Sequence, residues 1–225
     1  MSDSVAPTPL HILITGGEGG LARAVHQEFS PDGHCVHAPG RKEMDVRDEA
    51  QIEAYFSRLE RLDVLVANAG VTRDNAVTGV SDDDFTEVVN TNLRGTFLCA
   101  RAALKLMVKQ RKGHIVLIGS RSGRRGNQGQ SAYAASKAGL VGLAQSLARE
   151  YGGRNIRCNV VLPGFLETRM TAALKSEQLE AVRAEHTLGR FNTVENSARA
   201  IAFLALLDHV SGQVFTLDSR IDRWT

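Results

Sequence analysis

Short apolar runs recur along this chain, and segments of helical length separate them. Most of the runs are continuously apolar and do not alternate with polar residues, which is typical of strands covered on both faces of a parallel sheet. The runs are LHILIT (10–15), HCVHA (34–38), DVLVAN (63–68), HIVLIGS (114–120), IRCNVVLP (156–163) and QVFTLD (213–218). We therefore expect these runs to build one buried parallel sheet.

Between the runs, apolar residues recur at the spacing of an α-helix. The helical patterns cover residues 21–29, 48–59, 82–110, 131–151 and 194–207. The alternation of strands and helices predicts an α/β fold with a Rossmann-type, doubly wound parallel sheet. The chain has no internal repeat and no linker rich in Pro, Gly or Ser, so we predict a single domain over residues 10–225 after a short disordered tail at 1–9.

Composition narrows the class of protein. Hydrophobic residues make up 43% and charged residues 23% of the 225 residues, as in ordinary globular proteins. The net charge of +2 is too small to indicate nucleic acid as the main partner. No apolar run approaches the roughly 20 residues that span a membrane, and MSDSVAPTP has neither a basic leader nor an apolar core. We expect a cytoplasmic protein without a membrane partner.

Three cysteines, Cys35, Cys99 and Cys158, lie far apart and lack Cys-x-x-Cys spacing. An odd number fits buried thiols in a reducing compartment better than a disulfide framework or a zinc site. The sequence offers no evident His/Cys/carboxylate cluster, so we expect no metal.

The segment TGGEGGLA (15–22) follows the first strand and opens a helix. Gly16 and Gly20 would let the backbone turn tightly and approach a phosphate, while the helix N-terminus offers unpaired N–H groups. A flexible strand–helix turn would look similar, but the order of strand, turn and helix favours dinucleotide binding.

Tyr133 and Lys137 lie four residues apart in SAYAASKAGL (131–140) and would share one face of a helix. A nearby ammonium favours a phenolate, so we expect Lys137 to lower the pKa of Tyr133. Ser120 ends a strand 13 residues earlier, at the edge of a parallel sheet where ligands bind. The spacing alone is commoner for an ordinary surface tyrosine and a solvated lysine, but the glycine turn and Ser120 favour a reaction site.

Together these segments resemble the short-chain dehydrogenase/reductase family over residues 10 to 218. TGGEGGLA resembles its TGxxxGxG turn, ANAG (67–70) its NNAG motif, and LPGFLETRM (162–170) its Pro-Gly segment. The resemblance implies a catalytic tetrad of Asn92, Ser120, Tyr133 and Lys137. It implies cofactor contacts from Thr15, Gly16, Gly20, Leu21, Arg41, Asp45, Val46, Asn68, Ala69, Gly70, Tyr133, Lys137, Pro163, Gly164 and Thr168.

In this family the implied chemistry is hydride transfer from a reduced nicotinamide to a ketone. The resemblance implies that Tyr133 donates a proton, Lys137 holds the nicotinamide ribose, Ser120 bonds the carbonyl oxygen, and Asn92 holds a water next to Lys137. Segments 126–150 and 159–171 are similar to 3-oxoacyl-[acyl-carrier-protein] reductases. That similarity implies an acyl thioester substrate and docking of the acidic carrier protein at Arg111 and Arg154, which otherwise are solvated surface charges.

The chain departs from the family pattern after the second strand. Only a few residues separate Ala38 from Asp45, so a helix and a strand are missing or reduced to a turn. Arg41 and Lys42 stand where a basic residue favours the 2′-phosphate of NADP(H). Glu18 in the glycine turn would repel that phosphate, so NAD(H) stays open as the alternative.

At the other end, Ser219 and Arg220 replace the usual Gly-Gly pair after Asp218. In the family this end lies at a subunit interface, so we expect a homotetramer or a homodimer. The leading interpretation is an NADPH-dependent reductase of carrier-bound 3-oxoacyl thioesters in fatty-acid or polyketide-like biosynthesis. The alternatives are an NAD(P)-dependent dehydrogenase of a small secondary alcohol, sugar or cyclic ketone, and a non-catalytic subunit.

Overall fold

The computed structural model describes residues 9–31, 33–168, 171–172 and 175–221. The expected tail at 1–9 lies outside these residues apart from Pro9. None of the helices in the described ranges is long and apolar enough to cross a membrane.

Six strands form one sheet in the order β2-β1-β3-β4-β5-β6, and every neighbouring pair is parallel. The strands are β1 His11–Ile14, β2 Cys35–His37, β3 Val64–Ala67, β4 Gly113–Ile118, β5 Ile156–Leu162 and β6 Val214–Thr216. The predicted doubly wound parallel sheet is therefore confirmed, and each apolar run of the sequence coincides with one strand, although β4 begins one residue before its run.

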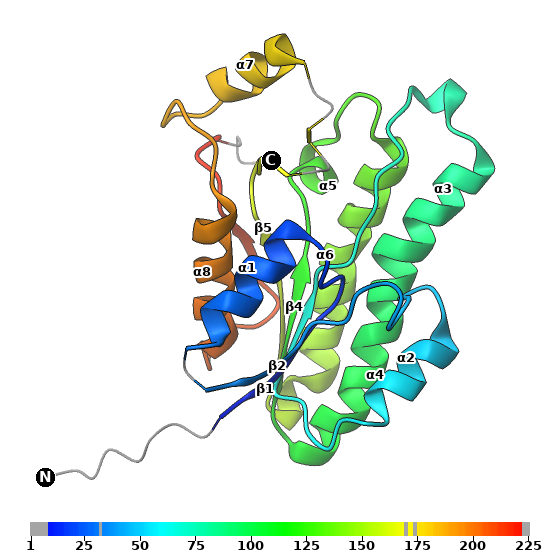
Figure 1. The fold of residues 1–225 in the computed structure, drawn as a ribbon, viewed down its shortest axis with the longest axis vertical. Coiled ribbons are helices and arrows are strands. Elements are labelled where there is room, and N and C mark those ends of the chain that lie inside the picture. Colours follow the sequence, from blue (N-terminus) through cyan, green and yellow to red (C-terminus); the bar gives the residue numbers. More distant parts are fainter. Residues whose placement is uncertain (1–8, 32, 169–170, 173–174, 222–225) are drawn as a thin grey trace, which may run out of the picture.

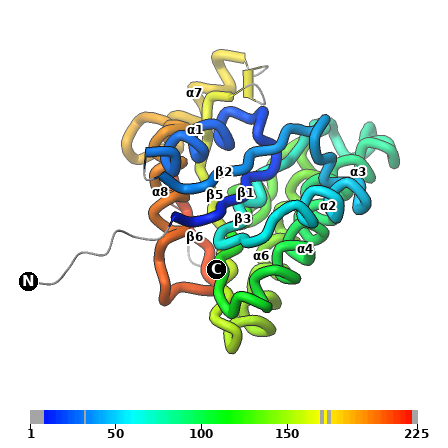
Figure 2. Tube along the Cα trace, turned by 60° about the horizontal axis from the view of Figure 1, so that its bottom comes forward, coloured from blue at the N-terminus to red at the C-terminus, as the bar shows by residue number. Residues whose placement is uncertain are grey.

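Helices cover both faces of the sheet (Figures 1 and 2). Helices α1 and α8 pack on one face, and α4 and α6 pack on the other, with α2 beside α4. Ile12 and Ile14 face the α1/α8 side, whereas Leu13 faces the opposite cluster, and all three are fully buried. Strands with two buried faces have no polar side to alternate with, which explains their continuous apolar runs.

The helices described are α1 Gly20–Phe29, α2 Glu49–Phe56, α3 Asp82–Val89, α4 Gly95–Gln110, α5 Ser122–Arg125, α6 Ser131–Tyr151, α7 Ser176–Ala184 and α8 Val194–Leu206. Short 3-10 turns cover η1 Val77–Gly79 and η3 Gly152–Arg154. The long helical pattern at 82–110 proves to be two helices joined by a π-helical turn, η2 Asn90–Arg94. The sequence pattern did not predict α5 and α7, which are short or largely exposed.

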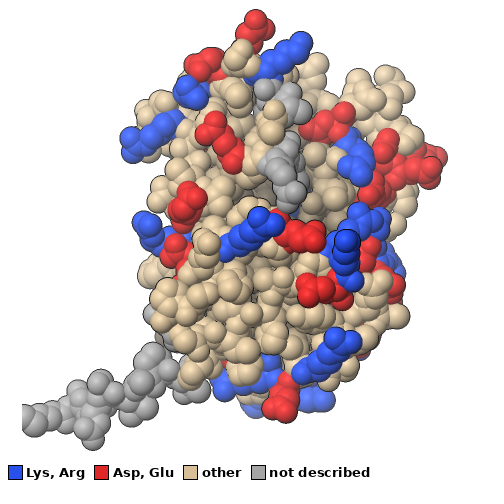
Figure 3. Space-filling model, in the orientation of Figure 1, with Lys and Arg blue, Asp and Glu red and all other residues tan. Residues whose placement is uncertain are grey.

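The segment after β2 contains no helix or strand until α2 begins, so residues 38–48 form only turns and irregular backbone. The expected shortening is therefore present, and β2 is an edge strand of the sheet. Cys99 and Cys158 are buried as expected, but Cys35 is exposed, because it lies on this edge. On the face shown in Figure 3, acidic and basic side chains are interspersed, in keeping with a small net charge.

Candidate active site

A large pocket opens beyond the carboxyl ends of the strands, where the parallel register brings the ends of β1, β3, β4 and β5 together. Its volume is about 1090 Å³. The glycine turn, the short segment 41–47 and the residues that follow β3, β4 and β5 line it, and α7 adds side chains from above. This is the edge at which open α/β sheets bind ligands.

The glycine turn is held by close backbone approaches. Gly16 has a φ of +71°, and a Cβ there would lie 2.9 Å from the Cα of Ala69. A Cβ at Gly17 would lie 2.0 Å from the carbonyl oxygen of Ala38. Gly20 has nothing within 4 Å of its Cβ position and starts α1. Gly16 and Gly17, rather than Gly20, therefore shape the turn, whereas Gly20 leaves the helix N-terminus open to an anion.

Thr15 joins the glycine turn to the segment after β3. It is 2% exposed and does not line the pocket. Its hydroxyl oxygen accepts hydrogen bonds from the backbone N–H groups of Asn68 and Ala69, both at 3.0 Å. The structure thus places Thr15 as a residue that positions two pocket segments, and not as a surface that contacts a ligand.

An ionic cluster borders the pocket along the shortened segment. Asp45 pairs with Arg47 at 2.6 Å and with Arg41 at 3.3 Å. The hydrogen bonds from Arg47 and the neighbouring guanidinium charges hold the pKa of Asp45 at about 2. The side chain of Arg41 is 61% exposed, so its remaining N–H groups can reach a ligand. No sequence motif indicated Arg47, although this residue directly follows the Asp45-Val46 pair.

Ser120, Tyr133 and Lys137 all line the pocket. Ser120 lies two residues beyond β4, and Tyr133 and Lys137 lie on the first turns of α6. The Tyr133 phenol is hydrogen-bonded to the Ser120 hydroxyl. The Lys137 ammonium lies 5.8 Å from the Tyr133 ring centroid and donates to the carbonyl of Ile118 at 2.7 Å. The three side chains predicted from separate segments therefore converge.

The expected effect of Lys137 on Tyr133 is wrong for this structure. Burial raises the pKa of Tyr133, the Ser120 hydrogen bond lowers it, and the nearby charge of Asp74 raises it further. Burial also lowers the pKa of Lys137 to about 8. Tyr133 is half-buried and Lys137 is buried, and this loss of contact with water favours the neutral form of each group. The phenol thus holds its proton at neutral pH, which suits a proton donor.

Asn92 is fully buried beneath the pocket and does not line it. It lies in the π-helical turn η2, where its side chain reaches the segment after β3. Its amide oxygen accepts from Val71 N at 2.8 Å, and its amide nitrogen donates to Val71 O at 2.9 Å and to Ser136 Oγ at 3.1 Å. These contacts make Asn92 a support of the pocket wall.

The segment after β5 closes the other side of the pocket. Pro163, Gly164 and Thr168 line it, and Gly164 has a φ of +85°. The Asn192 amide donates to the carbonyl of Pro163 at 3.0 Å and to that of Leu217 at 2.8 Å. Residues 169–170 of the predicted Pro-Gly motif lie outside the described residues.

The altered C-terminal segment also reaches the pocket. Arg220 lines it and pairs with Asp218 and, at 3.7 Å, with Glu185. Burial would raise the pKa of the Asp218 carboxyl, but the hydrogen bonds from Arg220 and the charge of His186 hold it below its usual value. Arg220, noted in the sequence only as a departure, is therefore an ion-paired part of the pocket wall.

Most residues expected at the site reach the pocket surface. Besides the three central side chains, the expected residues that line it are Gly16, Gly20, Leu21, Arg41, Asp45, Val46, Asn68, Ala69, Gly70, Pro163, Gly164 and Thr168. Four further residues that were not predicted also line the pocket: Arg23, Arg47, Asp74 and Gln130. Asp74 and Gln130 bond each other at 2.8 Å from distant segments, and no local motif marks them.

Arg111 and Arg154 lie at the opposite end of the sheet. Arg111 ends α4 just before β4, and Arg154 lies in η3 just before β5. The two segments adjoin, because Gly113 N donates to the carbonyl of Asn155 at 3.3 Å. Both arginines are exposed, and neither lines the pocket.

The absence of a His/Cys cluster expected from the sequence is contradicted. His11, Cys35 and His37 bring their potential ligand atoms within 4.8 Å of one another. This cluster could not be predicted from sequence spacing, because His11 lies 24 positions before Cys35 and strand pairing brings the two together.

The family model and the relatives that match this chain both carry the names of acyl-carrier-protein reductases. Residues 20–219 match the family model described as Enoyl-(Acyl carrier protein) reductase. The chain is 37% identical to the 3-oxoacyl-[acyl-carrier-protein] reductase FabG of Escherichia coli (strain K12) over 215 residues, covering 86% of this chain and 88% of that protein. It is 39% identical to FabG of Aquifex aeolicus over 220 residues, covering 95% and 88%.

Solved structures agree with these relatives. The structure titled "ElxO with NADP Bound" has a TM-score of 0.86 and 29% sequence identity, and the match covers 94% of this chain and 98% of that one. A variant of the same protein with NADPH bound matches with the same TM-score and 28% identity.

Proposed function

This chain belongs to the short-chain dehydrogenase/reductase family, and we propose that it reduces 3-oxoacyl thioesters to 3-hydroxyacyl thioesters with NADPH, acting in the cytoplasm on acyl groups held by a carrier protein. The observation that carries the proposal is the hydrogen-bonded Ser120–Tyr133 pair beside Lys137, at the sheet edge where a dinucleotide would lie. Relatives named as 3-oxoacyl reductases at 37–39% identity support the substrate class.

Each residue of the pair has a role that follows from its chemistry. When bound, the nicotinamide cofactor supplies the hydride. The Ser120 hydroxyl would donate a hydrogen bond to the ketone oxygen and stabilise the negative charge that develops there. Tyr133, whose proton is retained by burial, would donate that proton to the forming alkoxide. Lys137 would hold the ribose next to the nicotinamide and supply protons to Tyr133 through the pocket. Asn92 would keep the wall beside Lys137 in place.

The pocket suits a phosphorylated dinucleotide. Gly20 leaves open space at the N-terminus of α1, where backbone N–H groups can bind the pyrophosphate. Along the segment that would face the adenine ribose, the pocket is lined by Arg23, Arg41 and Arg47 against Glu18 and Asp45. Three cations against two anions favour the 2′-phosphate of NADPH, and a structural relative with NADP bound supports this choice.

Reduction of the ketone, rather than of an enoyl double bond, is the better match to the geometry. The family model's description names an enoyl reductase, whereas the relatives' names specify a 3-oxoacyl substrate. The hydroxyls of Ser120 and Tyr133 are hydrogen-bonded to each other, so both lie within reach of one substrate oxygen. A ketone oxygen needs both a hydrogen bond and a proton as it becomes an alcohol, and the pair provides both.

Carrier docking at Arg111 and Arg154 places a constraint on the assembly. Their end of the sheet and the pocket lie at opposite ends of β4, whose six residues span about 20 Å. The acyl arm would have to cover that distance or enter the pocket of a neighbouring subunit. We therefore propose a homo-oligomer, and the exposed Phe97 on α4 and Phe203 on α8 offer apolar surface for subunit contact.

The test is the initial rate of NADPH oxidation with three substrates: a 3-oxoacyl thioester, the matching trans-2-enoyl thioester and a small cyclic ketone. The proposal predicts turnover of the first in clear preference to the other two. Faster turnover of the enoyl thioester would indicate an enoyl reductase, and faster turnover of the small ketone would indicate a small-ketone reductase. Either result would contradict the proposed 3-oxoacyl reductase activity. Absence of turnover with NADPH bound would indicate a non-catalytic subunit.

Docking is tested separately with Arg111→Glu. The proposal predicts a raised KM for the carrier-bound substrate and an unchanged KM for a small thioester that lacks the carrier. Light scattering at the assay concentration tests the oligomer.

A further inference from the structure

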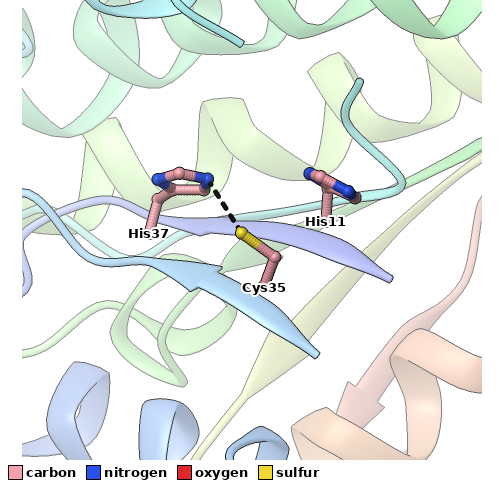
Figure 4. Close-up of side chains that lie close together, drawn as sticks. All are labelled: His11, Cys35 and His37. Atoms are coloured by element: carbon pink, nitrogen blue, oxygen red, sulfur yellow. Dashed lines mark hydrogen bonds between the residues drawn. The ribbon is translucent and has the colours of Figure 1, made fainter. Parts of the chain in front are cut away.

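Three side chains with metal-binding atoms share one face of the sheet at its open edge (Figure 4). His11 is the first residue of β1, and Cys35 and His37 are the first and last residues of β2. The parallel register pairs His11 with Cys35, and Cys35 and His37 share a face because they lie two positions apart on a strand. Two neighbouring strands thus hold the three ligand atoms within 4.8 Å of one another.

The distances approach those of a metal centre. Bonds of about 2.0 Å from zinc to nitrogen and about 2.3 Å to sulfur, at a tetrahedral angle, separate nitrogen from sulfur by roughly 3.6 Å. Cys35 Sγ lies 3.4 Å from His37 Nε2. The His11 ring lies beside them in Figure 4, with its nearest ligand atom within 4.8 Å of theirs, so rotation of its side chain toward them would complete three ligand positions.

The lone pairs of these groups are not committed elsewhere in the described part of the chain. The contact between Cys35 and His37 is the one side-chain hydrogen bond of either residue there, and the His11 ring makes none. The His11 backbone is fixed, because its N–H donates to the buried Asp63 at 2.9 Å, and Asp63 is itself paired with Arg61. The backbone that carries His11 is therefore anchored, while its ring is free to bind.

We infer that His11, Cys35 and His37 form a three-ligand site for one divalent transition-metal ion of the zinc class. One thiolate and two imidazoles suit zinc and similar ions of borderline softness, and do not suit Mg²⁺ or Ca²⁺. The exposure of Cys35 gives the ion a path from solvent and leaves a fourth position for water. Because binding displaces the thiol proton, the site takes the metal with release of one proton to solvent.

The site is separate from the pocket but joined to it through the backbone. None of its three residues lines the pocket. His37 is followed by Ala38 and Pro39, and the Pro39 carbonyl accepts a hydrogen bond from Gly17 N at 3.0 Å. The shortened segment leaves β2 at the sheet edge, where a metal bridge to β1 would fasten it. Metal binding would thereby stiffen the support of the glycine turn.

The test uses the full chain without a histidine tag, stripped of metal and with its thiols reduced. Co²⁺ is the spectroscopic probe, and Zn²⁺ is the competitor. We expect one Co²⁺ per chain, visible d–d bands of a tetrahedral site, a thiolate-to-cobalt charge-transfer band in the near ultraviolet, and displacement by Zn²⁺. Zn²⁺ should also raise the Tm, because it binds the folded chain.

The variants Cys35→Ser, His37→Gln and His11→Gln should each weaken binding at least roughly tenfold, and Cys35→Ser should also remove the charge-transfer band. His209→Gln, at an exposed histidine outside the cluster, is the matched control and should bind as the wild type does. Circular dichroism of the metal-free variants establishes that they fold. Failure of the wild type to bind one Co²⁺, or unchanged binding by any of the three variants, would overturn the site.

Discussion

The side-chain amide of Asn92 holds both polar groups of Val71: its oxygen accepts from Val71 N at 2.8 Å, and its nitrogen donates to Val71 O at 2.9 Å. Val71 lines the pocket, whereas Asn92 is fully buried behind it. At the adjacent Gly70, a Cβ would lie 3.2 Å from the Asn92 oxygen and 3.6 Å from Lys137 Nζ. Asn92 therefore fixes the wall against which the catalytic lysine is placed.

Asn92→Asp should damage both the fold and the site. The carboxylate keeps the acceptor for Val71 N but turns a second acceptor toward Val71 O in a buried position. An unpaired buried group of this kind costs about 2–4 kcal/mol of unfolding free energy. Urea unfolding and the KM for NADPH measure the two effects. Asn90→Asp, in the same π-helical turn but with no described side-chain hydrogen bond, is the control and should change stability by less than about 0.5 kcal/mol.

The pH dependence of the reduction rate should reflect the loss of the proton from the Lys137 ammonium. Burial lowers the pKa of its ammonium to about 8 in the free enzyme, while the Tyr133 phenol stays protonated to higher pH. As the pH rises through 8, Lys137 loses the proton that the reaction uses, so kcat/KM should fall about tenfold per pH unit above that point. Measurement of kcat/KM from pH 6 to 10 tests this. A profile that stays flat to pH 10 would show that the charge of Lys137 is not required.

Arg41→Ala should weaken the binding of NADPH and leave the binding of NADH unchanged. The exposed guanidinium borders the pocket beside Asp45, where only the phosphorylated cofactor carries a charge to meet it. Loss of one charge-assisted contact should raise the KM for NADPH by about tenfold. Initial rates with the two cofactors give both KM values. Lys42→Ala, one residue along and outside the pocket lining, should leave both unchanged. Equal changes in the KM values for NADPH and NADH in Arg41→Ala would contradict the role of Arg41 in binding the 2′-phosphate.

Gly17→Ala should destabilise the shortened segment. Its Cβ would meet the Ala38 carbonyl oxygen at 2.0 Å, so the backbone on one side must move. Such overpacking costs about 1–3 kcal/mol. Gly142→Ala should have the opposite effect. Gly142 lies within α6 and has nothing within 4 Å of its Cβ position, so the exchange should stabilise the helix by about 0.5–1 kcal/mol. Urea unfolding compares the two, and equal stability of the two variants would contradict the packing described.

Sequence periodicity was sufficient for the sheet and its helices because strands with two buried faces leave a continuous apolar run. Local motifs located Tyr133, Lys137 and Ser120 because the chemistry requires these residues at fixed spacing on α6 and beyond β4. The break between α3 and α4 at η2 could not be predicted, because residues 82–110 keep one helical pattern across the π-helical turn. Helix α7 was missed because none of its residues is buried.

Pairings between residues far apart in the sequence account for the remaining differences between the sequence-based predictions and the structure. Asp74 and Gln130 meet 56 positions apart, and His11 meets Cys35 only through strand register. The predicted direction of the Tyr133 pKa shift was wrong because the neighbouring charge can be read from the spacing, whereas the burial, which dominates, cannot. Burial is set by the packing of α6 on the sheet and the loops around it, and no spacing rule carries that information.

The proton-donor role of Tyr133 is tested by the turnover of a 3-oxoacyl thioester with NADPH by the wild type and by Tyr133→Phe. The exchange removes one hydroxyl from a half-buried side chain, so NADPH affinity and Tm should stay near the wild-type values. We expect kcat/KM to fall by about 10²–10⁴-fold, the usual contribution of a general acid. Tyr151→Phe, at the far end of α6, should keep full activity. Turnover by Tyr133→Phe at the wild-type rate would contradict the proton-donor role on which the proposed function rests.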